Sequence, residues 1–421
     1  MGILQDTFEA QAREHLSFHK VGTSLIQKRL EGLGIALTHA QLAEIESKLQ
    51  NIEGRTITFN LEESQLPFFS SGPVGEAVQN LQIDLADSGD SLTELIDGFS
   101  SRLSEAIPDV VDGVSQTLLE RLKSDAPLML RHRKKDRASF ESRLARVWRK
   151  PMNLLETFLV VALEAGDDFN REFRAVASQE NDYVFEVLTR LHARGCQIAS
   201  EIMALLRSGH ADGAHARWRS LHEVAVVGFL IKSASNETAE KYLLHEAIES
   251  YKAAKLYQQH CQTLGYEPLS EEEFKKIEAN YQFLIARFGL SYRNEYGWAA
   301  SLLGRQDPTL KDLEQHVGLA HLRPFYKMAS HNVHANPKSV FFKLGLCPSS
   351  QDILLAGPSN TGLADPAHAT AISLAQITVA LLTTKLNIDR LVTCQILTKL
   401  EHEIGEEFLT AQKSLEKDGV P

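Results

Sequence analysis

Two short segments of this chain bring imidazole and guanidinium groups together at helical spacing. The first is DGAHARWRSLHEVAVVGFLI, residues 212–231. At about 100° per residue, this sequence predicts a helix with one apolar face and one polar face. The polar face carries Asp212, His215, Arg219, His222 and Glu223. Arg219 can pair with Glu223 one turn away. Arg217 lies about 140° round the axis from His222, so only its long stem would bring the two heads together.

The second segment is HLRPFYKMASHNVHANPKS, residues 321–339. Pro324 suits a first helical turn and Pro337 is expected to end the helix. Between them an arc of roughly 100° carries Arg323, Lys327, Ser330, His331 and His334. Facing polar stripes on the two segments would form one groove with four histidines and several cations. Such a groove could bind a phosphodiester, and imidazole, with an ordinary pKa of about 6.5, suits proton transfer.

The Arg217 to His222 sequence, RWRSLH, resembles the signature of the HEPN superfamily (higher eukaryotes and prokaryotes nucleotide-binding), in which Arg precedes His by a few residues. Members of that superfamily are α-helical bundles, often metal-independent RNases of toxin and anti-phage systems. The resemblance implies that Arg217 holds the scissile phosphate, that His222 positions or deprotonates the ribose 2'-OH, and that two such helices meet in a homodimer. In that superfamily the residue after the Arg is commonly polar, whereas here it is Trp218. Because of this departure, Arg219 is an alternative to Arg217 as the active arginine.

A wider likeness surrounds this motif. The stretches GHADGAHARWRSLHEVAVVGFLI and KMASHNVHANP resemble an uncharacterised bacterial family known only as a domain of unknown function, over about residues 170–345. That family carries no established activity.

Two other interpretations of the same residues stay open. Arg, His and Glu between helices can satisfy one another and fix helix register, as Arg219 with Glu223 or His331 with His334 could do. A metal site would draw on His222, Glu223, His245, His331 or His334. The familiar phosphate-loop, dinucleotide, esterase and HExxH motifs are absent from the sequence. We therefore expect neither a metal nor another cofactor.

A basic segment, residues 131–150, holds nine Lys and Arg against Asp136 and Glu141, in a chain with a formal charge of -11. Helical spacing gives it an apolar face of Phe140, Leu144, Val147, Trp148 and, beyond it, Leu155. The solvated cations would contact RNA phosphates. Together with Lys327 and Arg323, the candidate RNA-binding residues are Arg137, Arg143, Arg146, Arg149 and Lys150. A merely solvated connecting helix and a membrane-surface helix are the alternatives.

Composition favours helices over a sandwich or barrel, because aromatic residues make up only 7% of the 421 residues. We expect an all-α, multi-helix bundle with a HEPN-like C-terminal core. The expected parts are an N-terminal helical region over 1–130, a basic amphipathic connecting helix over 131–165 and a HEPN-like domain over 166–421. The N-terminal region should contain one short strand or ordered loop at 55–60, followed by helix over 75–122.

The C-terminal half should consist of consecutive long helices. The expected ranges include 168–208, 211–233, 270–287, 324–335 and 366–416, with stops near Gly209, Gly265, Gly289 and Pro337.

Four widely spaced cysteines, Cys196, Cys261, Cys347 and Cys394, fit reduced thiols in a cytosol. The N-terminal sequence lacks an apolar leader, and residues 369–384 indicate a buried helix, so we expect a cytoplasmic protein without a membrane partner.

The leading hypothesis is an RNA-binding, metal-independent endoribonuclease of a bacterial toxin or anti-phage type, acting as a homodimer. Its acidic N-terminal region would recognise a protein partner. The alternative is a non-catalytic helical interaction or sensor protein of a defence or stress system.

Overall fold

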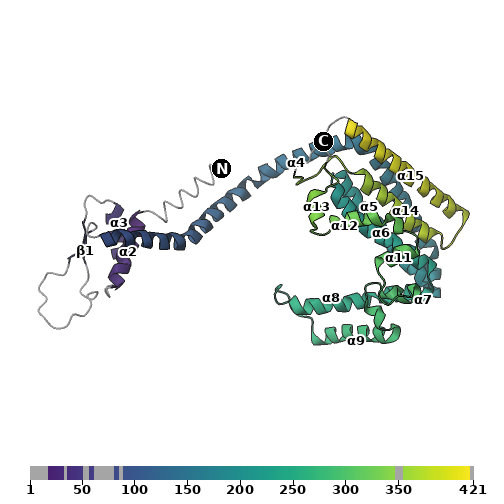
Figure 1. Ribbon diagram of the computed structural model, residues 1–421, viewed down its shortest axis with the longest axis horizontal. Helices are drawn as coiled ribbons and strands as arrows, with labels where there is room; N and C mark the ends of the chain where they lie inside the picture. Colours follow the sequence, from purple (N-terminus) through teal and green to yellow (C-terminus); the bar gives the residue numbers. More distant parts are fainter. Residues whose placement is uncertain are drawn as a thin grey trace. The chain divides into compact units, whose positions relative to one another are not determined.

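A computed structural model describes residues 18–32, 36–50, 56–60, 80–84, 89–346 and 354–417. Helices dominate these ranges, which confirms the all-α prediction (Figure 1). The chain divides into two compact units, Met1–Lys135 and Asp136–Pro421. One long helix, α4 (Gly89–Glu180), crosses this division, which lies inside the segment expected to connect two regions.

The first unit contains two packed helices and a small sheet. Helices α2 (Phe18–Gly32) and α3 (His39–Gln50) bury Ile26, Leu30, Ile45 and Leu49. Strand β1 (Thr56–Asn60) pairs antiparallel with β2 (Asn80–Asp84), with Thr56 opposite Asp84. The strand expected near 55–60 is therefore confirmed. The helix expected over 75–122 is wrong at its start, because residues 80–84 pair with β1 and α4 begins only at Gly89.

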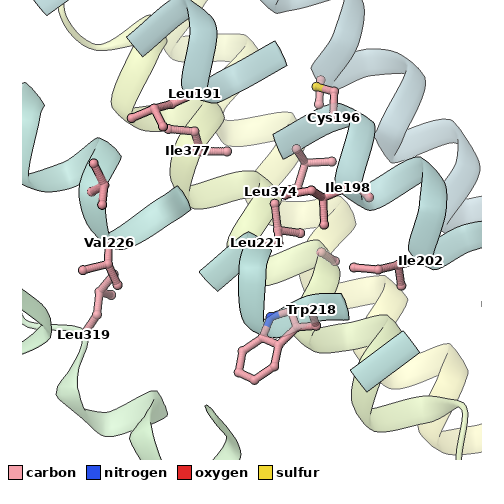
Figure 2. Close-up of a cluster of buried hydrophobic side chains, with 14 of the residues drawn as sticks. Leu191, Cys196, Ile198, Ile202, Trp218, Leu221, Val226, Leu319, Leu374 and Ile377 are labelled. Carbon is pink, nitrogen blue, oxygen red and sulfur yellow. The ribbon is translucent and has the colours of Figure 1, made fainter. Parts of the chain in front are cut away.

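The second unit is built round α5 (Tyr183–Arg207), α6 (Ala211–Ser233) and α14 (Ala364–Leu382), which pack against one another. Figure 2 shows apolar side chains from these three helices meeting in the core. The approach of α6 to α14 is close at Gly228, where an added Cβ would lie 2.3 Å from Cδ1 of Ile377. Glycine at this position lets the two helices meet.

The C-terminal half of α4 and helix α15 (Ile388–Lys417) complete the main bundle. Trp148 of α4 is buried 5.7 Å from the Phe408 ring of α15, and its indole N–H donates to the Asn360 carbonyl at 3.1 Å. Leu144 and Leu155 are also buried, whereas Phe140 and Val147 are partly buried against the same core. The predicted apolar face of residues 140–155 is confirmed.

Shorter helices cover one side of α6 and form a hairpin beyond it. They are α7 (Asn236–Leu244), α8 (Glu246–His260), α9 (Glu271–Phe288), α10 (Ala300–Leu303), α11 (Leu310–His316), α12 (Arg323–His331) and α13 (Pro337–Phe341). Single 3-10 turns, Leu290–Arg293, Gly297–Ala299 and Ala320–Leu322, link some of them. Helices α8 and α9 lie side by side (Figure 1), and α11 and α12 both contact α6.

Two of the predicted helix ends coincide with positive-φ glycines. Gly209 (φ 75°) and Gly289 (φ 90°) follow the ends of α5 and α9 within two residues. The third glycine, Gly265 (φ 73°), lies beyond a turn, because α8 already ends at His260. Three breaks were not predicted. They lie at Asn181 (φ 51°) between α4 and α5, at His245 between α7 and α8 within an expected helix over 236–264, and between Leu382 and Ile388. The helix expected to end at 335 stops at His331, and Pro337 begins α13 instead of ending a helix.

Candidate functional site

The first feature of the candidate site is a buried network that joins α6 to α11 and α12. His222 of α6 and Glu314 of α11 are both fully buried, with Nε2 of His222 3.0 Å from Oε1 of Glu314. The other carboxylate oxygen accepts a hydrogen bond from Nη1 of Arg323 at 2.7 Å. Because a carboxylate only accepts, Nε2 of His222 must donate. One carboxylate therefore ties three helices together.

Glu314 is ionised within this network. Burial alone would raise its pKa, but hydrogen bonds from His222 and Arg323, with the charge of Arg323, outweigh it and hold the pKa below the ordinary value. Its negative charge is balanced by the adjacent Arg323 guanidinium. The opposite nitrogen of His222, Nδ1, is buried and has no hydrogen-bond partner among the described residues.

A second polar group adjoins the first through Tyr326 of α12. The Tyr326 hydroxyl accepts a hydrogen bond from Nε of Arg219 at 2.6 Å and donates one to Glu223 at 2.5 Å. Arg219 and Glu223 also form the predicted one-turn ion pair at 3.3 Å. The Tyr326 ring lies 5.7 Å from the His222 ring and beneath the Arg219 guanidinium. Burial raises the pKa of Tyr326, so the hydroxyl keeps its proton.

Arg217 has different partners from His222. Its Nε is ion-paired with Glu201 of α5, and its Nη1 donates to the Ser220 hydroxyl at 3.2 Å. No hydrogen bond or ion pair within the described ranges joins Arg217 to His222. Helix α6 is also packed against α5, α14, α11 and α12, so His222 faces a filled interior.

The remaining histidines of the two segments do not share one groove with His222. His215 is buried beside Trp218, with ring centroids 5.6 Å apart, and burial lowers its pKa to about 4. His331, the last residue of α12, is half-buried. His334 lies beyond the end of α12 and is exposed, as is Lys327. The two segments do face each other, but through Tyr326, which contacts Arg219 and Glu223, instead of through imidazole pairs. Arg323 is linked to His222 only by way of Glu314.

A cleft of about 720 Å³ opens beside this network. Five glutamates and two arginines line it with several apolar and aromatic side chains, including Glu186, Arg190, Arg194, Glu223, Tyr242, His245, Glu246, Glu249, Glu295, Tyr296 and Trp298. Nε2 of His245 is engaged within the fold, because it lies 2.9 Å and 3.0 Å from two backbone carbonyls and must donate to them. The acidic lining does not favour a polyanion such as RNA.

The structure groups no three metal-ligating side chains of the kinds His, Cys, Asp and Glu anywhere in its described ranges. Over the same residues, no helix combines the length and apolar character that a membrane crossing requires. Cys196, Cys261 and Cys394 are free thiols. Cys347 lies outside the described residues.

Besides the buried network and the cleft, the structure presents a cationic face on α4. Arg143, Arg146, Arg149 and Lys150 are all exposed. At about 100° per residue they occupy an arc of about 120°, opposite the buried side of the helix. Arg143 donates to Ser139 and Lys150 pairs with Glu407 of α15, both at the surface. Arg137 pairs with Glu141 and lies off this arc.

The sequence analysis missed the acids that pair with Arg217 and His222. Glu201 and Glu314 are 16 and 92 residues away from Arg217 and His222 respectively. A signal for Glu314 was present, since it shares a helical face with buried Leu310 and Leu313. A carboxylate on an apolar face requires a buried partner.

Residues 185–350 match the model of a family of unknown function (DUF5677). The matched region contains α6, α11 and α12, and therefore both polar groups. No curated protein and no solved structure matches the chain. An uncharacterised domain family is thus supported over this region, whereas none of these comparisons links the chain to the HEPN superfamily.

Proposed function

We propose that this chain is a non-catalytic helical protein that binds RNA on the cationic face of α4. The observation that carries this proposal is the arc of Arg143, Arg146, Arg149 and Lys150. Buried Leu144 and Trp148 hold the opposite side of the same helix against the core. The four cations are therefore presented together to solvent.

The geometry of this face suits a phosphate backbone. The four cations lie within eight residues, 143–150, which correspond to a rise of about 10 Å along the helix. Arginine can bind phosphate through two parallel N–H groups, and several such contacts release counterions from a nucleic acid. Binding through this face should be independent of base sequence and sensitive to salt.

The environment of His222 argues against cleavage in this fold. Its imidazole is sealed from solvent and bound to Glu314. A general base must reach the proton that it removes, within hydrogen-bond distance or through one water. Arg217, which would hold the phosphate, is instead engaged by Glu201. The Arg and His of the motif thus act as links between helices.

The binding proposal is tested by reversing two charges on the arc. In Arg146→Glu with Arg149→Glu, affinity for a fluorescent single-stranded RNA, measured by anisotropy, should fall at least tenfold. The slope of log affinity against log salt should shrink by about 0.7 for each phosphate that the variant no longer neutralises. The matched control is Lys399→Glu with Lys413→Glu, which makes nearly the same change in net charge at two exposed residues of α15 that do not belong to the arc. Equal losses of affinity in both double variants, or none in either, would contradict the proposal.

The second candidate is the metal-independent endoribonuclease that the HEPN resemblance implies, in a toxin or anti-phage system. In its favour, Nδ1 of His222 has no hydrogen-bond partner in the described part of the chain. Because that nitrogen is buried, it can act only if the packing around His222 opens. This candidate predicts that wild-type protein cuts mixed cellular RNA in EDTA and that His222→Ala, Arg217→Ala and Arg219→Ala do not.

The binding proposal predicts no new RNA ends from wild type in the same assay. Cleavage that His222→Ala abolishes, with the circular dichroism spectrum unchanged, would replace the binding proposal by the nuclease. The acidic N-terminal region remains the segment that we propose for a protein partner.

A further inference from the structure

Helix α4 carries an apolar stripe that lies within the first unit and that the described residues of this unit leave uncovered. Leu122 is 62% exposed, Val111 55% and Met129 52%. Val114, Leu118 and Ala126 complete the stripe and are half-buried. At about 100° per residue, all six fall within an arc of about 120°. Apolar side chains aligned over about 30 Å of helix mark an interaction surface.

This part of α4 also needs support from outside itself. Gly113 and Pro127 both lie inside it, where glycine costs backbone entropy and proline removes a helical hydrogen bond. Most helical stability in proteins comes from packing of an apolar face. A partner along the stripe would provide that packing.

The stripe is symmetric about residue 120. Residues at equal distances before and after position 120 are both apolar: Leu118 and Leu122, Val114 and Ala126, and Val111 and Met129. Its two polar members, Ser115 and Asp125, also correspond. A two-fold axis through residue 120 would therefore set every apolar member opposite another one, the self-complementary arrangement that an isologous interface requires.

The charged residues along the helix are divided at the same position, with an acidic half before it and a basic half after it. Residues 103–120 contain four carboxylates and no Lys or Arg, whereas residues 121–135 contain six Lys and Arg and one Asp. Antiparallel copies would place each acidic half beside a basic half. Parallel copies would place like charges together, which is destabilising.

We propose that two copies of this chain associate through residues 111–130 of α4, antiparallel and centred on residue 120. This interface is independent of the RNA-binding face, which lies on residues 143–150. It also differs from the α6 pairing that the HEPN resemblance implied, because α6 is enclosed by other helices.

The first test is the mass of the full chain in solution by sedimentation equilibrium. Wild type should behave as a dimer of 46.9 kDa chains, and Leu118→Asp with Leu122→Asp should be monomeric. The matched control, Gln116→Asp with Thr117→Asp, adds the same charge off the stripe and should remain dimeric. A monomeric wild type, or a dimer that survives the stripe variant, overturns the proposal. A protein of another kind covering the stripe would give that monomeric result.

A cross-linking test checks orientation without disrupting the stripe. Chains bearing Leu118→Cys and chains bearing Leu122→Cys are co-expressed with different tags and oxidised. Antiparallel pairing sets residue 118 of one copy beside residue 122 of the other, so the mixed disulfide should form. Within Leu118→Cys alone, the two cysteines are offset by about 6 Å along the axis and exceed disulfide reach.

Cross-linking of Leu118→Cys by itself would indicate a parallel pair, and absence of a cross-link in the mixture would overturn the proposed interface. Wild type, with its native cysteines, provides the background.

Discussion

Three side chains of α6 that could do chemistry are each paired with a particular acid. Glu314 binds His222, Glu201 binds Arg217, and Glu223 binds Arg219. The energetic consequence is asymmetric, because a buried ionic pair adds little net stability while the loss of one member leaves the other uncompensated. The network should therefore appear in stability measurements more than in catalytic ones.

Removing Glu314 tests the network directly. In Glu314→Ala, His222 loses its acceptor and Arg323 its counter-charge, so we expect a loss of about 3 kcal/mol in the free energy of unfolding by urea. Glu272→Ala removes a carboxylate from an exposed ion pair with Lys276 and should change stability by less than about 0.5 kcal/mol. A loss below about 1 kcal/mol for Glu314→Ala would mean that the network is dispensable.

Two buried histidines make stability depend on pH. Burial lowers the pKa of both His192 and His215 to about 4. The unfolded chain binds these protons near pH 6.5 and the folded chain does not, so acid favours unfolding. Their contribution is complete above about pH 6.5 and is lost as the pH falls towards about 4, by about 3 kcal/mol each at most.

Replacing one of these imidazoles should flatten that dependence. In His215→Gln, urea midpoints between about pH 6.5 and about pH 4.5 should fall less steeply than in wild type, whatever the absolute stability. His402 is 79% exposed and serves as control, since His402→Gln should leave the slope unchanged. An unaltered slope in His215→Gln would show that this imidazole binds its proton as readily in the folded chain as in the unfolded one.

At the scale of elements, the C-terminal half of α4 has two roles on opposite sides. Its apolar side is anchored by Trp148, which contacts Phe408 and donates to Asn360. Its cationic side remains in solvent. Because the anchor and the cations alternate along one helix, the anchor fixes which residues face outward.

Removing the Trp148 side chain should lower the free energy of unfolding more than any substitution on the cationic side of the helix. Trp148→Ala removes a fully buried ring, and we expect a loss of about 3 to 5 kcal/mol in the free energy of unfolding. The neighbouring exposed Arg149→Ala should change stability by less than about 0.5 kcal/mol. If the two variants were equally stable in urea, α4 would not be held through Trp148.

The helices could be predicted from local patterns because periodicity and glycine stops act within a few residues. The buried face of residues 140–155 and the end at Gly209 are of this kind. The break at Asn181 was missed because asparagine there adopts positive φ without a glycine signal. The partners of His222 and Tyr326 were missed because contacts across about 100 residues depend on tertiary packing.

At the scale of the whole molecule, the chain consists of two units with separate cores. Among the residues that the structure describes, the first unit buries a few apolar side chains, such as Ile26 and Ile45, whereas the second contains the large hydrophobic cluster. Small cores give marginal stability, because the fraction of surface buried falls with size. The two units should therefore unfold at different denaturant concentrations.

The positions of tryptophan allow this to be measured with the full chain. Trp148, Trp218 and Trp298 are the three tryptophans and all belong to the second unit. In a urea titration, tryptophan fluorescence should report one transition, while far-ultraviolet circular dichroism reports an additional earlier one from the first unit. Ile45→Ala, which truncates a fully buried residue of α3, should move only the earlier transition. Trp218→Phe, in α6, should move only the later one.

Coincident curves from both probes would show that the chain unfolds as a single cooperative body, and the division after Lys135 would then have no thermodynamic meaning.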